Sequence, residues 1–263
     1  MKIEDLDNIM NGYSLLYVYE KTGDVKYKQA ADKLYEWVCE YKKQMGSPIP
    51  YRKHHPTHVY IDGLGMVVPF LCRYGAMFEN QEAINLGTEQ ILEFLKYGMD
   101  EITGLTYHGY DTKTKVKQGI IGWGRAVGWL MLAMADSMEY LPEGKEREKI
   151  TEAFERLVKA VFQYFRTDGY FSWQLSAVEG PKDTSATAMI GYAVKKGISV
   201  LGVNQEQSVK LDCEHNNVGQ EKNSYSCAQE YQPNDWQEVL GPEFEKPYYT
   251  ELHNFLKNDI NND

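Results

Sequence analysis

Hydrophobic residues recur at steps of three and four positions from residue 6 to residue 200, which is the period of amphipathic α-helices. The first stripe spans 6–17, and after a break at Gly23 a second spans 27–38. Further helices are predicted at 63–74, 81–96, 122–140, 146–165 and 184–196. About seven helices joined by short loops predict an all-α fold built from antiparallel helical pairs.

Three other segments depart from the helical period. Residues 104–116 alternate and carry turn residues, which predicts a β-hairpin, and 167–173 predict a second short one. After Gly202 the chain is rich in Gln, Glu, Asn and Ser, which is typical of a flexible linker. We therefore expect a helical domain at 1–200, a polar linker at 201–235 and a short helical tail at 236–263.

Composition narrows the class of protein. The chain is 43% hydrophobic and 25% charged, which is typical of a globular protein, and it has no apolar run long enough to span a membrane. The acidic opening lacks an apolar segment, and the four cysteines are widely spaced, so we expect no signal peptide and a cytoplasmic location. A net charge of −10 argues against nucleic-acid and membrane partners. The 20 tyrosines and 5 tryptophans would suit stacking on sugars, although most aromatic residues fill cores.

Polar residues lie beside aromatic residues in three clusters. The first is 60–70, preceded by the basic and histidine-rich stretch 52–58; the second is 107–111, and the third is 123–129. Each falls at the start of a predicted helix or on a predicted hairpin. We expect all of them at the same, loop-rich end of the helical array.

These clusters resemble the unsaturated glycuronyl hydrolases of glycoside hydrolase families 105 and 88, and most of all the unsaturated rhamnogalacturonyl hydrolases of family 105. Asp62 lies in W-x-D-G-x-x-M-x-x-P-F, with Tyr60 in place of the usual Trp. His108 lies in G-L-x-Y-H-x-x-D, and Arg125 in W-x-R-x-x-G-W. Together with the opening segment that contains Asp7, these motifs keep the family's order over residues 4–198.

The resemblance implies an (α/α)6 six-hairpin barrel with short β-hairpins in its loops. About seven of the barrel's twelve helices are visible here, so the barrel would be partial, incomplete at both ends. Apolar helical faces left exposed would then favour self-association.

The resemblance also implies a reaction. Such enzymes remove a 4,5-unsaturated uronic acid from the non-reducing end of oligosaccharides left by polysaccharide lyases, as in pectin degradation. An aspartic acid protonates C4 of the vinyl ether, water adds at C5, and the hemiketal collapses. Asp62 matches this general acid/base and Asp7 the second acidic residue. The matched substrate-binding residues are His108, Arg125, Trp123, Trp129, Tyr60 and one of His54 and His55. No cofactor or metal is implied.

Each candidate also has a simpler interpretation. Asp62 could be only a helix N-cap, Asp7 an ordinary helix acid, and His108 a loop residue without function. Core packing is the favoured use of Trp129, and Asp136 is expected to cap or pair within its own helix. At the level of the whole chain, the alternatives are a non-catalytic carbohydrate-binding or structural fragment and an ordinary glycosidase that uses two carboxylates.

A separate resemblance covers the tail. Residues 235–257 resemble the opening helical segment of family 1 uracil-DNA glycosylases, but the catalytic G-Q-D-P-Y-H motif of that family occurs nowhere in the chain. We therefore expect no role in DNA repair. A junction between two neighbouring reading frames would explain the tail.

Overall fold

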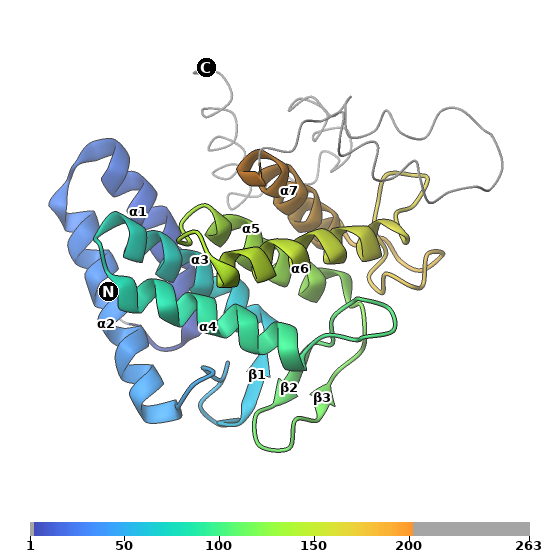
Figure 1. The fold of residues 1–263 in the computed structure, drawn as a ribbon, viewed down its shortest axis with the longest axis horizontal. Coiled ribbons are helices and arrows are strands. Elements are labelled where there is room, and N and C mark those ends of the chain that lie inside the picture. The colour runs from blue at the N-terminus through green and yellow to red at the C-terminus, as the bar shows by residue number, and fades with distance from the viewer. Residues whose placement is uncertain (1–2, 202–263) are drawn as a thin grey trace. The chain divides into compact units, whose positions relative to one another are not determined.

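Helices dominate the computed structural model, which describes residues 3–201 (Figure 1). The elements are the 3-10 helix η1 (Leu6–Met10), the helices α1 (Asn11–Thr22), α2 (Val25–Met45), α3 (Ile61–Met77), α4 (Gln81–Tyr97), α5 (Gly124–Met138), α6 (Lys145–Phe162) and α7 (Thr184–Leu201), and the strands β1 (His58–Tyr60), β2 (Gly109–Asp111) and β3 (Lys117–Gln118). The prediction of about seven α-helices is confirmed within the described residues.

Local signals in the sequence set several helix ends. Gly23 adopts a left-handed conformation (φ 66°) and its N–H donates to the Tyr19 carbonyl, which ends α1. One residue later, the Asp24 side chain accepts from the Lys26 N–H and caps α2. Asn80 caps α4 in the same way, by accepting from the Ala83 N–H. These caps explain why the breaks fall where the sequence predicted them.

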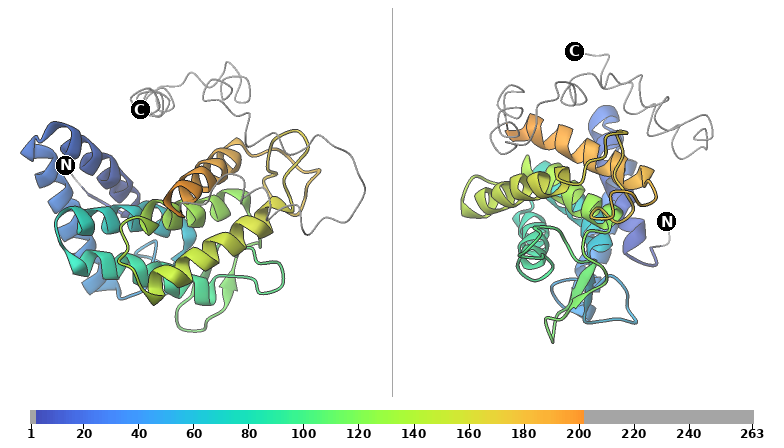
Figure 2. Two further views of the ribbon diagram at one scale, coloured as in Figure 1. Left: turned by 45° about the horizontal axis from the view of Figure 1, so that its top comes forward. Right: turned by 90° about the vertical axis from the view of Figure 1, so that its right-hand side faces the viewer.

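The helices form an inner and an outer layer. Helix α3 packs between α1 and α5, and α5 also packs on α7, so these four helices form one row. Helix α2 pairs with α1, α4 with α3, and α6 with α5; Figure 1 shows α4 and α6 in front of α3 and α5. The views in Figure 2 show the α1–α2 pair at one end of the row and α7 at the other. Because α3 and α5 are buried on nearly all sides, they form the inner layer.

Two hydrophobic clusters hold this arrangement together. One cluster contains residues of β1, of β2 and of every helix from α3 to α7. Phe94, Tyr110 and Phe154 belong to it. The other lies between η1, α1, α2, α3 and α4 and includes Leu6 and Phe70. Helix α3 contributes to both, so its N-terminus is fixed from both sides.

A small antiparallel sheet lies beside the start of α3. Strand β1 pairs with β2, with Val59 opposite Tyr110, and β2 pairs with β3. Gly109 is required here, because a Cβ at this position would clash with the Val59 carbonyl oxygen. The hairpin predicted at 104–116 is confirmed as β2 and β3, with its second strand just beyond the predicted end.

Other predictions differ from the structure. The second hairpin, at 167–173, is wrong: residues 166–170 form a turn, and the Arg166 guanidinium ties the loop together by donating to the carbonyls of Val178 and Gly180. Asp136 does not pair within its helix, because it accepts a hydrogen bond from Tyr192 of α7 at 2.7 Å. Helix α5 packs closely on α7, which brings the Tyr192 hydroxyl within reach of this buried carboxyl group.

The predicted linker and tail, 201–235 and 236–263, lie almost wholly outside the described residues, so these divisions stay predictions. The described residues belong to a single unit of the chain. Among the helices of the described part, none has the length and apolarity that crossing a membrane requires.

Candidate active site

Asp62 lies in the first turn of α3, where strand β1 runs directly into the helix. The N-cap position is occupied by Tyr60, whose side chain makes no capping hydrogen bond, so the interpretation of Asp62 as an N-cap is wrong. The Asp62 side chain is 14% exposed, and its Oδ2 lies 2.7 Å from Nε2 of His108. The His108 ring therefore holds the Asp62 carboxyl group in place, and part of the Asp62 side chain stays accessible to solvent.

His108 is fixed through both its backbone and its ring. Its carbonyl accepts a hydrogen bond from the Ile61 N–H at 3.0 Å, which ties the start of β2 to the start of α3. The His108 ring lies 4.7 Å from the Tyr60 ring and 4.9 Å, nearly perpendicular, from the Trp123 ring. Asp62, His108, Tyr60 and Trp123 thus form one contiguous cluster of predicted residues.

Asp7 is held by two residues that the sequence analysis assigned no role. Its two oxygens accept from Tyr51 Oη and from Arg52 Nη1, each at 2.5 Å. Burial alone would raise the pKa of Asp7, but these hydrogen bonds and the Arg52 charge outweigh it, and the pKa is lowered. The only signal for Arg52 in the sequence was its place in the basic stretch 52–58.

Tyr51 connects Asp7 to the cluster around Asp62. Burial is the largest cause that raises the pKa of Tyr51, the Asp7 carboxylate is the next, and Asp62 adds a smaller contribution in the same direction. The Tyr51 ring also packs beside Gly63, the residue after Asp62, where an added Cβ would lie 3.3 Å from Tyr51 Cδ2. Its ring centre is 6.5 Å from that of Tyr60. Asp7 and Asp62 therefore share Tyr51 as a neighbour.

The start of α5 supplies a cation and further rings. Trp123 occupies the N-cap position of α5. The exposed Arg125 guanidinium lies 4.5 Å from the Trp123 ring centre, and no described residue forms an ion pair with it. Trp129 is half-buried and packs on Gly65 of α3, where a Cβ would clash with its indole ring. The contact with Gly65 favours core packing for Trp129. The Arg125 guanidinium, which is exposed and forms no ion pair with the described residues, is available to an anion.

The histidines of the preceding loop extend away from this cluster. His54 and His55 are both exposed, and their ring centres are 4.5 Å apart. The His55 ring stacks on His58 at 5.0 Å, and His58 in turn lies beside Tyr60. Within the described residues, no group of three side chains is arranged to hold a metal ion.

A further ring at the α5 end was not predicted. Trp173 is 48% exposed, and its carbonyl accepts a hydrogen bond from the Gly124 N–H at 2.8 Å. The backbone of the loop 166–182 therefore runs beside the start of α5, which carries Trp123 and Arg125. Sequence periodicity gave no signal for this contact, since it joins residues about fifty positions apart.

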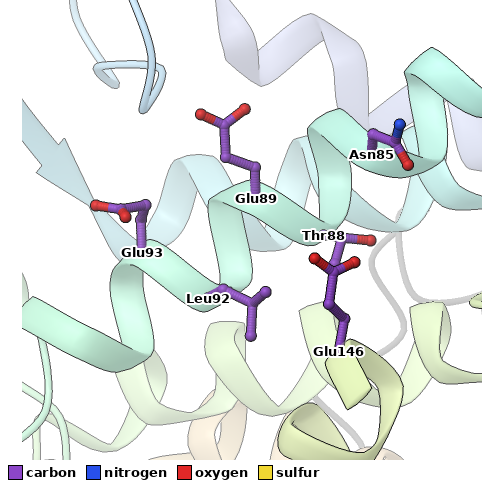
Figure 3. Close-up of a pocket in the computed structure, with 6 residues that line it drawn as sticks. All are labelled: Asn85, Thr88, Glu89, Leu92, Glu93 and Glu146. Carbon is purple, nitrogen blue, oxygen red and sulfur yellow. The ribbon is translucent and has the colours of Figure 1, made fainter. Parts of the chain in front are cut away.

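A hollow on the surface of the described structure lies away from these residues. A cavity of about 330 Å³ lies between α4 and the start of α6, lined by Asn85, Thr88, Glu89, Leu92, Glu93 and Glu146 (Figure 3). Its three glutamates make it unsuitable for an anionic sugar, and none of the predicted site residues lines it.

The described helices bring together a carboxyl–imidazole pair, a second carboxylate and aromatic rings, which suits the binding of a polar small molecule. The chain belongs to Glycosyl Hydrolase Family 88, whose sequence signature matches residues 2–210.

Among curated relatives, the unsaturated rhamnogalacturonyl hydrolase YesR of Bacillus subtilis is 28% identical over 139 residues, 51% of this chain and 40% of that protein. Protein Atu3128 of Agrobacterium fabrum is also 28% identical over 139 residues, 49% of this chain and 59% of that protein. The chain thus spans about half the length of the curated relatives it matches.

Solved structures agree on the fold. A glycoside hydrolase of family 105 from C. acetobutylicum matches with a TM-score of 0.69 and 27% identity, over 79% of this chain and 60% of that one. An unsaturated glucuronyl hydrolase from Bacillus sp. GL1 matches with a TM-score of 0.57 and 16% identity, over 79% and 71%. The expected six-hairpin barrel type is confirmed by these neighbours.

The resemblance of the tail to a second family is also confirmed. A stretch of 25 residues, 10% of this chain, is 72% identical to the uracil-DNA glycosylase of Lactiplantibacillus plantarum and covers 11% of that protein.

Proposed function

We propose that the protein is a hydrolase that removes a 4,5-unsaturated uronic acid from the non-reducing end of lyase-generated oligosaccharides of the rhamnogalacturonan or pectin type. The observation that carries this proposal is the Asp62–His108 pair, 2.7 Å apart, in the first turn of an inner helix among aromatic rings. Support comes from the similarity to a rhamnogalacturonyl hydrolase and from the shared fold.

In this proposal Asp62 is the general acid. Its proton passes to C4 of the vinyl ether, water adds to C5 and gives up a proton to the Asp62 carboxylate, and the resulting hemiketal collapses and releases the remaining sugar. His108 keeps the carboxyl group in one orientation and offers a second site for the proton, since its Nε2 lies within hydrogen-bond distance. Asp7 accepts hydrogen bonds from sugar hydroxyls or from the water.

The substrate carboxylate is the natural partner of Arg125. A guanidinium holds a carboxylate through two parallel hydrogen bonds, and no carboxylate of the described residues is paired with that of Arg125. Trp123 and Tyr60 provide stacking faces for the sugar ring. We propose that one of His54 and His55 contacts the substrate beyond Tyr60, while Trp129 packs on Gly65 in the core.

The test follows the ultraviolet absorbance of the conjugated double bond during incubation with unsaturated disaccharides. Hydration of that bond removes the absorbance, whereas an ordinary two-carboxylate glycosidase would leave it intact. A fragment that only binds or supports other chains would leave both the double bond and the glycosidic bond unchanged. Equal cleavage of a saturated disaccharide would refute the vinyl-ether mechanism.

We also propose a cytoplasmic location, because the two described cysteines, Cys39 and Cys72, are free thiols. Fractionation of the source cells, with detection of the protein by antibody, tests this location.

A further inference from the structure

The contacts around Asp7 form a closed ring of hydrogen bonds. Tyr51 Oη donates to Asp7 Oδ1, Arg52 Nη1 donates to Asp7 Oδ2, and Arg52 Nη2 donates to Tyr51 Oη at 2.8 Å. The Arg52 guanidinium also lies over the Tyr51 ring, 4.0 Å from its centre. Three side chains from two separate segments therefore fix one another's positions.

The electrostatics of this ring favour one protonation state. Burial works against the charge on Asp7, but the donors and the cation prevail and lower its pKa. The pKa of Tyr51 is raised, so its hydroxyl keeps the proton that it donates to Asp7. Arg52 is half-buried and is also 3.3 Å from Asp5, so its charge is shared between two carboxylates.

The same residues reach the start of α3. Tyr51 and Leu6 both pack beside Gly63, so the segment that carries Asp7 and the loop that carries Tyr51 meet at the turn that carries Asp62. Each Asp7 oxygen accepts one hydrogen bond within the ring and keeps a lone pair for another donor. Asp7 is thereby held as an acceptor close to the candidate acid.

We propose that Tyr51 and Arg52 are a positioning pair that holds Asp7 as a hydrogen-bond acceptor aimed at the substrate, so that Asp7 accepts hydrogen bonds while the transferred proton belongs to Asp62. This inference rests on the proposed function. Asp7 and Asp62 have different roles in this inference because the side chains around them differ.

The first part of the test needs no activity. Carbon-13 NMR titration of the Asp7 carboxyl, assigned with Asp7→Asn, is compared between the wild-type chain and Arg52→Gln. Loss of an adjacent cation should raise the Asp7 pKa by about one unit or more. Arg52→Lys should restore part of the lowering, and Lys26→Gln, which removes an exposed charge paired with Asp24, should leave it unchanged. An Asp7 pKa that is the same in Arg52→Gln as in the wild type overturns the inference.

The second part measures turnover of an unsaturated disaccharide against pH. Arg52→Gln and Tyr51→Phe should lower kcat roughly tenfold to a hundredfold, with a smaller change in KM, because Asp7 loses its orientation. The acidic limb of the Arg52→Gln profile should move to higher pH, which a merely structural role would not cause.

Both parts have outcomes that separate the claims. An acidic limb that stays in place, or a kcat loss no larger than that of Lys26→Gln, overturns the positioning role. If Arg52→Gln fails to fold, Arg52→Lys and Tyr51→Phe decide by the same two readouts. A wild-type chain without turnover refutes the proposed function, and the titration then still decides whether Arg52 holds Asp7 ionised.

Discussion

Asp136 should make the folded protein less stable as the pH rises. Its side chain lies on α5, is 8% exposed and accepts one hydrogen bond, from Tyr192 of α7. Burial raises its pKa from 3.8 to about 6, against the lowering effects of Tyr192, Lys196 and Arg73 and with the raising effect of Glu139. The folded state therefore disfavours the ionised form of this carboxyl group.

The size of the effect follows from that pKa. Below about pH 4 the carboxyl is protonated in both states and costs nothing. Between about pH 4 and about pH 6 the carboxyl group ionises in the unfolded chain but stays protonated in the folded protein. The free energy of unfolding therefore falls over this range of pH. Each pKa unit corresponds to about 1.4 kcal/mol, so at pH 7.5 the cost is about 3 kcal/mol.

Asp136→Asn isolates this cost, because the amide keeps the shape and can still accept from Tyr192. Urea unfolding at pH 7.5 should show a free energy of unfolding higher than wild type by as much as about 3 kcal/mol, shrinking toward pH 4.5. Glu40→Gln, which removes an exposed carboxylate on α2, should show no such pH dependence. A difference between Asp136→Asn and wild type that does not change with pH would refute the reasoning.

Two further predictions concern substrate binding and the ends of the chain. Arg125→Lys should raise KM for an anionic disaccharide by roughly tenfold, because an ammonium cannot reproduce the guanidinium fork; an unchanged KM in steady-state kinetics would argue against this assignment. Deleting 211–263, beyond the family match, should leave the thermal midpoint of the helical part no lower, whereas a clear drop in a calorimetric scan would show that the tail is integrated.

The helices could be predicted from the sequence because the signals that determine them lie close together in the chain. Stripes at helical spacing and caps such as Asp24 and Asn80 determine each helix from residues close in the chain. The loop 167–173 was misjudged because its second half pairs with residues further along the chain and not within itself. The Trp173 N–H donates to the Pro181 carbonyl and the Asp183 N–H donates to the Phe171 carbonyl, while the Arg166 side chain donates to other carbonyls of the loop.

The candidate active site could be predicted from the sequence only in part. Asp62, His108 and Trp123 were found together because each lies in a motif that resembles one family. The partners of Asp7 and Asp136 were not found, because Arg52 is 45 positions from Asp7 and Tyr192 is 56 positions from Asp136. No local period encodes such contacts, and they depend on how the helices pack.

The measurement that tests the proposed function most directly is the loss of double-bond absorbance with an unsaturated rhamnogalacturonan disaccharide, for wild type and Asp62→Asn. We expect the wild type to consume the double bond and to leave a saturated disaccharide intact. Asp62→Asn should lose about 10²–10⁴-fold of the rate with its circular dichroism spectrum unchanged, because the amide cannot transfer the proton. Retention of more than about a tenth of the wild-type rate would remove Asp62 from the acid role. Equal cleavage of the saturated disaccharide would contradict the proposed reaction itself.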